Sequence, residues 1–259
     1  AWMWARLHAR STKLVTYEGG FQAFADDFAA ALLKMGVEIR YNTVVERIES
    51  KDNQGVEIHA SSGKENFDQV LVTLSPAQMA KMTPQLPADY LKGLLELKSI
   101  GAVVLTISLK HQLSREGYYW YNLPKSAGFP FLALVEHTNF LPKEKFGGEN
   151  LIYCGDYLET DHEYFKMTAD ELLARFMPSF TRINPDFKPE WVNRVWLTRA
   201  TYAQPVPLIN HSKNIPAIQS PLPGVFFASM SQVYPWDRGT NFAVEIARRA
   251  AGLMLDSLR

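Results

Sequence analysis

Apolar residues near the start of the chain recur at helical spacing. Phe21, Phe24, Phe28 and Leu32 fall three or four positions apart in the segment YEGGFQAFADDFAAALLKMG, which opens with a glycine turn. This spacing places the four side chains on one face of a helix, and Gly36 fits the position just beyond its C-terminus. The pattern predicts an amphipathic helix.

Shorter, strand-like segments follow this helix. Residues 37–42 (VEIRYN) predict one short strand, and residues 44–50 and 56–60 predict two more, separated by the turn KDNQG. In residues 67–76 (FDQVLVTLSP) the run of Val70, Leu71 and Val72 is continuously apolar, which is typical of a strand covered on both faces. We expect an α/β unit interrupted by an antiparallel excursion.

The middle of the chain is rich in β-branched and aromatic residues, which favours strands. Strands are predicted at 101–109, 118–124, 129–140, 150–158 and 192–203. Thr168 and Glu171 form a capping-box pattern at the start of a predicted helix over 168–183. Several strands with one helix indicate an α+β region.

The C-terminal segment returns to an α/β pattern. Residues 224–251 (GVFFASMSQVYPWDRGTNFAVEIARRAA) predict a buried strand, a long loop and an alanine-rich helix. The predicted fold class is therefore α/β plus α+β. We place boundaries at 1–16 (a helix), 17–76, 77–223 and 224–259, with the second and fourth segments forming one domain around the third.

Composition and charge exclude several classes of protein. Lys+Arg and Asp+Glu are equal at 27 each, without a basic patch, so we expect no nucleic-acid partner. The single cysteine, Cys154, cannot form an internal disulfide, which favours a reducing, cytoplasmic location. We expect no transmembrane segment, because no apolar run is long enough. The start at Ala1, within a helix-like stretch, is interpreted as a piece of a longer protein.

Three stretches in this order resemble the superfamily of flavin-containing amine oxidases, protoporphyrinogen oxidases and phytoene desaturases. They are residues 19–49, which end in NTVVERIE, residues 67–76 and residues 224–251. "EHTNF" and "YPWDRGTN" are similar to segments of bacterial NAD(P)/FAD-dependent oxidoreductases. The resemblance implies a partial, three-layer FAD-binding domain, formed by 17–76 and 224–259, with an inserted mixed-sheet substrate domain at 77–223. The helix expected within 1–16 is assigned to the substrate region.

The resemblance also implies FAD as cofactor, held mainly by an N-terminal G-x-G-x-x-G turn on which the pyrophosphate rests. That pattern is absent from this sequence. The chain therefore resembles the C-terminal portion of these proteins. We expect FAD in the full-length parent and little or no FAD binding by this chain alone.

The resemblance assigns cofactor contacts to specific positions. Val45 matches a valine whose backbone meets the adenine ring; the alternative is an ordinary strand residue. Thr240, Asn241 and Phe242 match a helix start under the pyrimidine edge of the flavin, where free N–H groups favour negative charge. The alternative is a simple N-cap by Thr240 or Asn241.

Three further positions are weaker matches to the same family. Ser229 and Met230 stand where many relatives carry glycine followed by an acidic residue that reaches the ribityl chain. A methionine is a poor hydrogen-bond acceptor, so Asp237 is considered as a substitute from the loop. An ion pair with Arg238 or a solvated loop is the alternative for Asp237.

No catalytic acid or base is identified. The strand at 101–109 lacks the lysine that amine oxidases of this kind often carry near the flavin. Glu136 and His137, as neighbours on a strand, would face opposite ways, which favours a structural polar network. The six histidines lack metal-site spacing, so no metal is expected.

Four consecutive aromatic residues, Tyr118, Tyr119, Trp120 and Tyr121, could line a substrate cavity or pack in the core. The main functional hypothesis is hydride transfer from a C–N or C–C bond of a small organic substrate to flavin. A flavin-dependent isomerase or mutase, and a non-catalytic interaction module, are the alternatives. Expected partners are a small-molecule substrate and a second copy of the chain.

Overall fold

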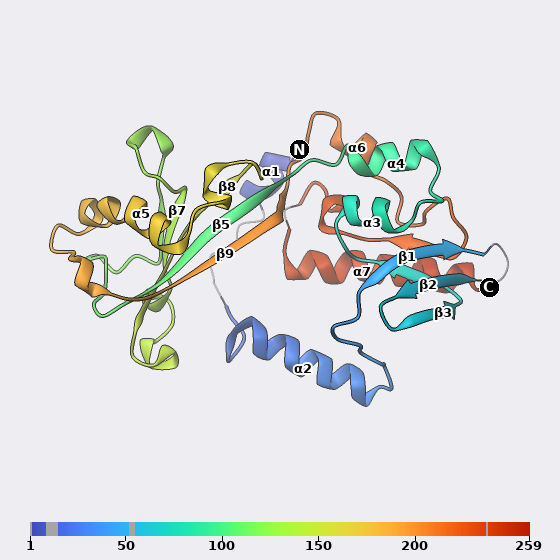
Figure 1. The fold of residues 1–259 in the computed structure, drawn as a ribbon, viewed down its shortest axis with the longest axis horizontal. Coiled ribbons are helices and arrows are strands. Elements are labelled where there is room, and N and C mark those ends of the chain that lie inside the picture. Colours follow the sequence, from blue (N-terminus) through green and yellow to red (C-terminus); the bar gives the residue numbers. More distant parts are fainter. Residues whose placement is uncertain (1, 9–14, 52–54, 237) are drawn as a thin grey trace. The chain divides into compact units, whose positions relative to one another are not determined.

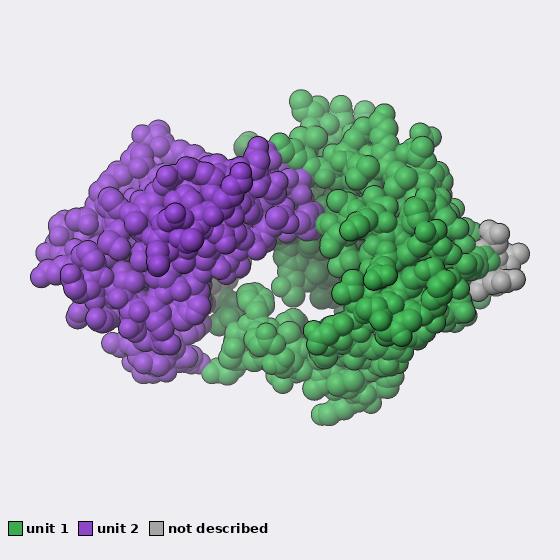
Figure 2. All heavy atoms as spheres, in the orientation of Figure 1, with its two compact units in different colours: residues 1–98, 207–259 green, residues 99–206 purple. Residues whose placement is uncertain are grey.

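The computed structural model describes residues 2–8, 15–51, 55–236 and 238–259. The chain divides into two compact units (Figure 2). Unit 1 comprises Ala1–Lys98 and Pro207–Arg259, and unit 2 comprises Ser99–Val206. In the part of the chain that the structure describes, no helix is both long and apolar enough to cross a membrane.

Unit 1 contains a three-stranded antiparallel meander, β1 (Val45–Ser50), β2 (Val56–Ala60) and β3 (Gly63–Phe67) (Figure 1). One face carries Ile48 and Val56, which are buried in a cluster with α3 (Pro76–Met82) and α4 (Ala88–Leu95). The alternation of apolar and charged residues therefore gives this sheet one buried face and one solvated face.

A parallel strand pair joins the two ends of unit 1. β4 (Val70–Val72) pairs with β10 (Val225–Phe227). Phe227 faces the cluster under the meander, whereas Phe226 packs with Ile246 and Ala250 of α7 (Thr240–Ser257). Meander, parallel pair and helix make three layers, which confirms the predicted partial three-layer α/β assembly.

The predicted first helix is confirmed as α2 (Gly20–Lys34), but residues 37–42 do not form the predicted strand. A strand is defined by its backbone partner, and none of the described residues pairs with this segment. No residue of α2 is buried, and Phe21 and Phe28 are largely exposed. A second short helix, α1 (Trp2–His8), precedes it.

Unit 2 is built on a five-stranded antiparallel sheet with strand order β6-β7-β8-β5-β9. Its strands are β5 (Ser99–Leu109), β6 (Trp120–Asn122), β7 (Ala133–Glu136), β8 (Asn150–Leu158) and β9 (Val192–Pro205). The long strands β5 and β9 run side by side (Figure 1). Leu172, Phe176 and Phe180 of α5 (Ala169–Ile183) close the core on one face of the sheet. This confirms the predicted α+β region.

Two local predictions in unit 2 have different outcomes. The capping box of α5 is confirmed, because Thr168 accepts a hydrogen bond from the Glu171 N–H and the Glu171 carboxylate accepts one from the Thr168 N–H. Of the strand predicted at 129–140, only the part that forms β7 is a strand, so Glu136 and His137 are not neighbours on one strand. Glu136 ends the strand, and His137 begins a 3₁₀ helix.

The remaining elements are short. They are α6 (His211–Asn214) and 3₁₀ turns at Lys125–Ala127, His137–Asn139, Lys143–Phe146, Glu163–Phe165, Pro189–Trp191 and Met230–Gln232.

The compact units divide at different residues from the sequence-based boundaries. Residues 77–98, assigned to the substrate domain from sequence, form α3 and α4, and these helices pack with the meander in unit 1. Residues 207–223 also belong to unit 1, where Ile218 packs with Phe226. The inserted unit is therefore one continuous segment.

Candidate functional site

The N-terminus of α7 is the best-defined candidate cofactor position. Its N-cap is Gly239, in an extended conformation, and no side chain of the described residues caps the helix. Thr240, Asn241 and Phe242 are the first three helical residues, so the suggestion that Thr240 or Asn241 is the cap is wrong. The first turn also carries no acidic side chain. Its backbone N–H groups therefore suit a hydrogen-bond acceptor or an anion.

Aromatic packing shapes the same helix start. The rings of Trp236 and Phe242 stack, with centroids 5.8 Å apart and planes inclined by 9°. Between this pair and Arg249 lies a depression of ≈ 60 Å³. An apolar cavity of about 150 Å³ holds one benzene ring, so this space does not admit a ring system. A cofactor could meet the helix start only from outside this depression.

Ser229 and Met230 are engaged within the chain. The Ser229 hydroxyl accepts a hydrogen bond from the Ser231 N–H. The backbone N–H of Ser229 donates to the side-chain oxygen of Gln232 at 2.8 Å. Ser229 is buried, and Met230 packs against the cluster of Phe226 and Ile246. Both residues stabilise the turn after β10 in this structure. Asp237 lies outside the described residues.

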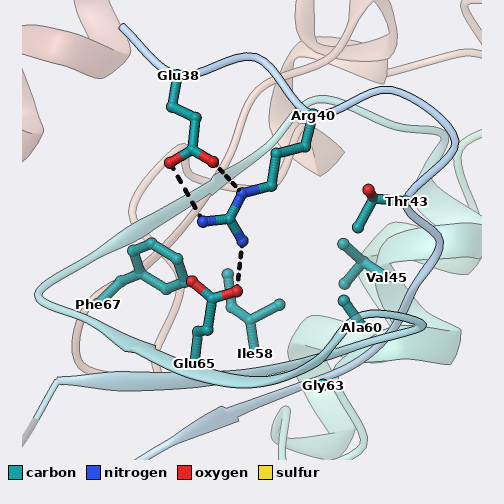
Figure 3. A pocket seen from close by; sticks show the side chains of 9 residues that line it. All are labelled: Glu38, Arg40, Thr43, Val45, Ile58, Ala60, Gly63, Glu65 and Phe67. Atoms are coloured by element: carbon teal, nitrogen blue, oxygen red, sulfur yellow. Dashed lines mark hydrogen bonds and ion pairs between the residues drawn. The ribbon is translucent and has the colours of Figure 1, made fainter. Parts of the chain in front are cut away.

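Val45 begins β1 and lines a larger depression of ≈ 330 Å³ (Figure 3). Its apolar lining residues are Val45, Ile58, Ala60 and Phe67. It shares no lining residue with the depression at α7. Glu38, Arg40 and Glu65 also line it, so the depression combines charged groups with an apolar surface that suits a ring.

Arg40 lies at the edge of this depression, between two carboxylates (Figure 3). Its guanidinium is bonded to Glu38, at 2.5 Å, and to Glu65 of β3. The hydrogen bonds from Arg40 lower the pKa of Glu38. These bonds tie residues 38–40 to the meander, so the loop between α2 and β1 is fixed beside Val45.

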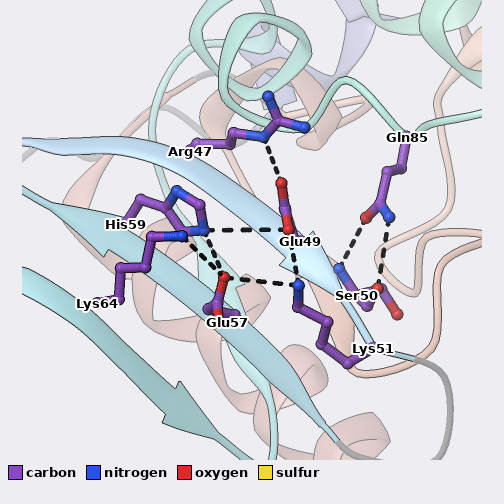
Figure 4. A network of polar contacts seen from close by, with 8 residues as sticks. All are labelled: Arg47, Glu49, Ser50, Lys51, Glu57, His59, Lys64 and Gln85. Atoms are coloured by element: carbon purple, nitrogen blue, oxygen red, sulfur yellow. Dashed lines mark hydrogen bonds and ion pairs between the residues drawn. The ribbon is translucent and has the colours of Figure 1, made fainter.

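The solvated face of the meander gathers Glu49, Glu57 and His59, whose ligand-type atoms lie within 4.8 Å of one another (Figure 4). His59 Nε2 is 2.6 Å from Glu57, and this hydrogen bond lowers the pKa of the Glu57 carboxyl. The two carboxylates also pair with three cations: Arg47, Lys51 and Lys64. A metal ion would have to displace these cations, so the cluster is better described as a neutralised surface network.

The sheet of unit 2 has an open face opposite α5. A depression of ≈ 200 Å³ lies on this face. We call it the aromatic trough; it is lined by Ala102, Val104, Trp120, Asn122, Leu132, Ala133, Val135, Tyr153, Gly155, Asp156 and Tyr157. Mainly apolar depressions with few polar groups are typical of small-molecule sites.

The four consecutive aromatic residues separate by environment. Trp120 lines the trough, and Tyr121 packs against the core cluster. The ring of Tyr119 contacts Phe140, and that of Tyr118 contacts Tyr121. Sequence reasoning missed Tyr153 and Tyr157, although the alternation in NLIYCGDYL could have placed both on one face.

Glu136 and Cys154 are structural. The buried Glu136 carboxylate accepts hydrogen bonds from the N–H groups of Leu113, at 2.7 Å, and Ser114, at 3.1 Å. Cys154 is fully buried, and burial raises the pKa of its thiol. A thiol held in its neutral form is a poor nucleophile.

Comparison with protein families gives one extensive match. A family model described as flavin containing amine oxidoreductase matches residues 3–255. A search of curated proteins gives no match.

Solved structures with the same fold include a putative protoporphyrinogen oxidase from Exiguobacterium sp. 255-15, with 14% identity and a TM-score of 0.76 over 97% of this chain and 54% of that one. A triple mutant of putrescine oxidase has 15% identity and a TM-score of 0.71, over 92% and 53%. Reduced UDP-galactopyranose mutase has 15% identity and a TM-score of 0.52, over 66% and 36%. The chain spans about half the length of the first two proteins.

Proposed function

Since the chain belongs to the flavin-containing amine oxidoreductase family, we propose that it is the C-terminal part of an FAD-dependent oxidoreductase. The proposed reaction transfers a hydride from a C–N or C–C bond of a small organic substrate to the flavin. The parent protein is proposed to be cytoplasmic. This chain alone is proposed to be inactive, because its sequence lacks the G-x-G-x-x-G turn.

The observation that carries this proposal is the start of α7, where the N-cap is Gly239 and none of the described side chains caps the helix. Three backbone N–H groups, of Thr240, Asn241 and Phe242, meet neither a side-chain cap nor an acidic side chain among the described residues. Such donors stabilise negative charge that develops on a bound group. We assign them to the pyrimidine edge of the flavin, and we assign the Val45 backbone to the adenine. FAD, when bound, supplies the hydride acceptor.

We also propose roles for Ser229, Met230 and Asp237. Ser229 would have to exchange its bond with Ser231 to reach a ribityl chain. We therefore assign Ser229 and Met230 to backbone contacts only. Asp237 is kept as a proposed acceptor from the loop.

A flavin-dependent isomerase or mutase is the second candidate. It is supported by the likeness to UDP-galactopyranose mutase, and by the absence of a lysine from β5. Turnover that consumes an electron acceptor or releases hydrogen peroxide supports the oxidoreductase, whereas product formation without net oxidation supports the mutase. A non-catalytic interaction module would show neither.

The test uses the full-length parent protein. We expect it to purify with flavin absorption bands and this chain to purify without them. Asn241→Pro removes one donor at the second position of α7 and is expected to reduce both the flavin content and the rate of flavin reduction. Asp89→Pro makes the same change at the second position of α4 and is the matched control. Equal flavin content and equal rates in both variants would show that the α7 start does not contact the cofactor.

A further inference from the structure

We propose that the aromatic trough of unit 2 binds an uncharged, planar ring compound that carries a hydrogen-bond acceptor. The trough lies wholly within Ser99–Val206. Its identification as a substrate site rests on the proposed function, but its ligand class is argued from the trough alone.

The register of the sheet gives the trough a floor of small side chains. Ala133 of β7 is opposite Gly155 of β8, and Gly155 is opposite Val104 of β5. Because paired residues point to the same face of a sheet, these three positions form one row across the strands. Small residues in a row leave room for a flat group to approach the sheet.

Larger side chains border this row. Trp120, Val135 and Tyr153 form the next row on one side, since Trp120 pairs with Val135, and Val135 pairs with Tyr153. Tyr157 lies on the other side, opposite Ala102. Trp120 is 52% exposed. A small floor between aromatic side chains suits a flat ring, which can stack on the floor and meet ring edges at its sides.

The size of the trough limits the ligand. Its volume of ≈ 200 Å³ exceeds the cavity of about 150 Å³ that holds one benzene ring. One ring or a fused pair of rings fits, and a nucleotide does not.

The charge of the lining favours an uncharged ligand. Asp156 is the single acidic residue of the lining, but it is opposite Val103 of the core cluster, so its side chain points to the other face of the sheet. It also forms an ion pair with Lys125 at 3.1 Å. A cationic amine would therefore find no carboxylate to pair with in the trough. The face offers no uncompensated carboxylate among the lining residues.

Asn122 supplies the polar contact. Its amide oxygen accepts a hydrogen bond from the Trp120 indole N–H at 2.9 Å. This bond orients the amide, and its nitrogen donates to no partner among the described residues. A carbonyl or ring nitrogen of the ligand can accept that hydrogen bond.

The test is an NMR binding titration of this chain with coumarin, a planar bicycle with one carbonyl acceptor. Two further probes are cyclohexanecarboxamide, which has an acceptor but no planar ring, and benzyltrimethylammonium, which has a ring and a charge. We expect coumarin to bind with a Kd below about 5 mM and at least about tenfold more tightly than either other probe. No flavin is required, so the result is independent of the cofactor assignment.

Variants localise the binding. Trp120→Ala is expected to weaken coumarin binding about fivefold, and Ala133→Leu to abolish it by filling the floor. Trp196→Ala is the matched control, because Trp196 is 45% exposed on the same face but does not line the trough. It should leave the Kd within about twofold.

Four results would overturn the proposal. They are no coumarin binding, equal binding of all three probes, equal weakening by Trp120→Ala and Trp196→Ala, and a dimer that Trp120→Ala dissociates. The last result would assign the face to a second copy of the chain. Flavin bound by the parent protein together with a trough that fails to bind coumarin would overturn this inference and leave the proposed function intact.

Discussion

At the scale of single residues, two glycines of this chain lie in very different surroundings. Gly155 lies in the middle of a sheet, where a Cβ would meet the Val104 side chain at 2.8 Å and the Val103 carbonyl oxygen at 2.9 Å. Gly252 lies in α7, where a Cβ would meet nothing within 4 Å. The same substitution therefore has opposite consequences at the two sites.

Gly155→Ala is expected to lower the free energy of unfolding by about 1–3 kcal/mol, because the backbone oxygen of Val103 cannot move aside without disturbing the ladder. Gly252→Ala is expected to raise it by up to about 1 kcal/mol through helix propensity. Urea denaturation followed by circular dichroism measures both. Equal effects in the two variants would contradict the close contact at Gly155.

At the scale of elements, a single tyrosine fixes α4 to the segment that precedes β10. The Tyr90 hydroxyl donates a hydrogen bond to the carbonyl oxygen of Ala217 at 2.7 Å. Burial raises the pKa of Tyr90 from 10.0 to about 12. The folded state therefore holds the phenol proton more tightly than the unfolded state.

This difference predicts a pH dependence in the alkaline range. A raised folded-state pKa contributes stability that is complete below pH 10.0 and is lost as the pH rises toward about 12. Tyr90→Phe is expected to be less stable than the unsubstituted chain by about 1 kcal/mol at pH 7. This difference in the free energy of unfolding should become smaller as the pH rises from 10.0 toward about 12. Tyr41→Phe, at an exposed position, is the control. Parallel stability curves for Tyr90→Phe and the unsubstituted chain would contradict the assignment.

Elements with local causes were predicted correctly, and so were strands whose own composition is strongly β-branched or aromatic, such as β5 and β8. The capping box of Thr168 and Glu171 acts within one turn, and the spacing of Phe21, Phe24 and Phe28 is a property of one helix. Residues 37–42 were predicted wrongly as a strand because strand pairing depends on distant chain. The trough was missed for the same reason, since its floor is assembled from three strands that only the register of the sheet aligns.

At the scale of the whole chain, unit 2 has the properties of an independent domain. Every residue of its core cluster lies within Ser99–Val206, including those on α5 and on the sheet strands. Unit 1, in contrast, needs both ends of the chain, because β4 and β10 pair across the insertion.

Residues 99–206 expressed alone are therefore expected to fold cooperatively. A single urea transition and dispersed amide chemical shifts would show this. Residues 1–98 alone are expected to lack a cooperative transition, since they leave β4 without β10. A collapsed, non-cooperative state of 99–206 would mean that its core depends on contacts outside the segment.

The pairing of Ser99 with Pro205 at the base of β5 and β9 affects the order of folding. Val70 must meet Val225 across the whole insertion. If unit 2 forms first, its two ends are already held together, which shortens the open chain between these strands roughly threefold. The entropy lost on closing a loop grows with the logarithm of its length, so this shortening saves about 1 kcal/mol. The folded insertion then holds the two halves of the surrounding domain together. Mutations that slow the folding of unit 2 should therefore delay the pairing of β4 with β10.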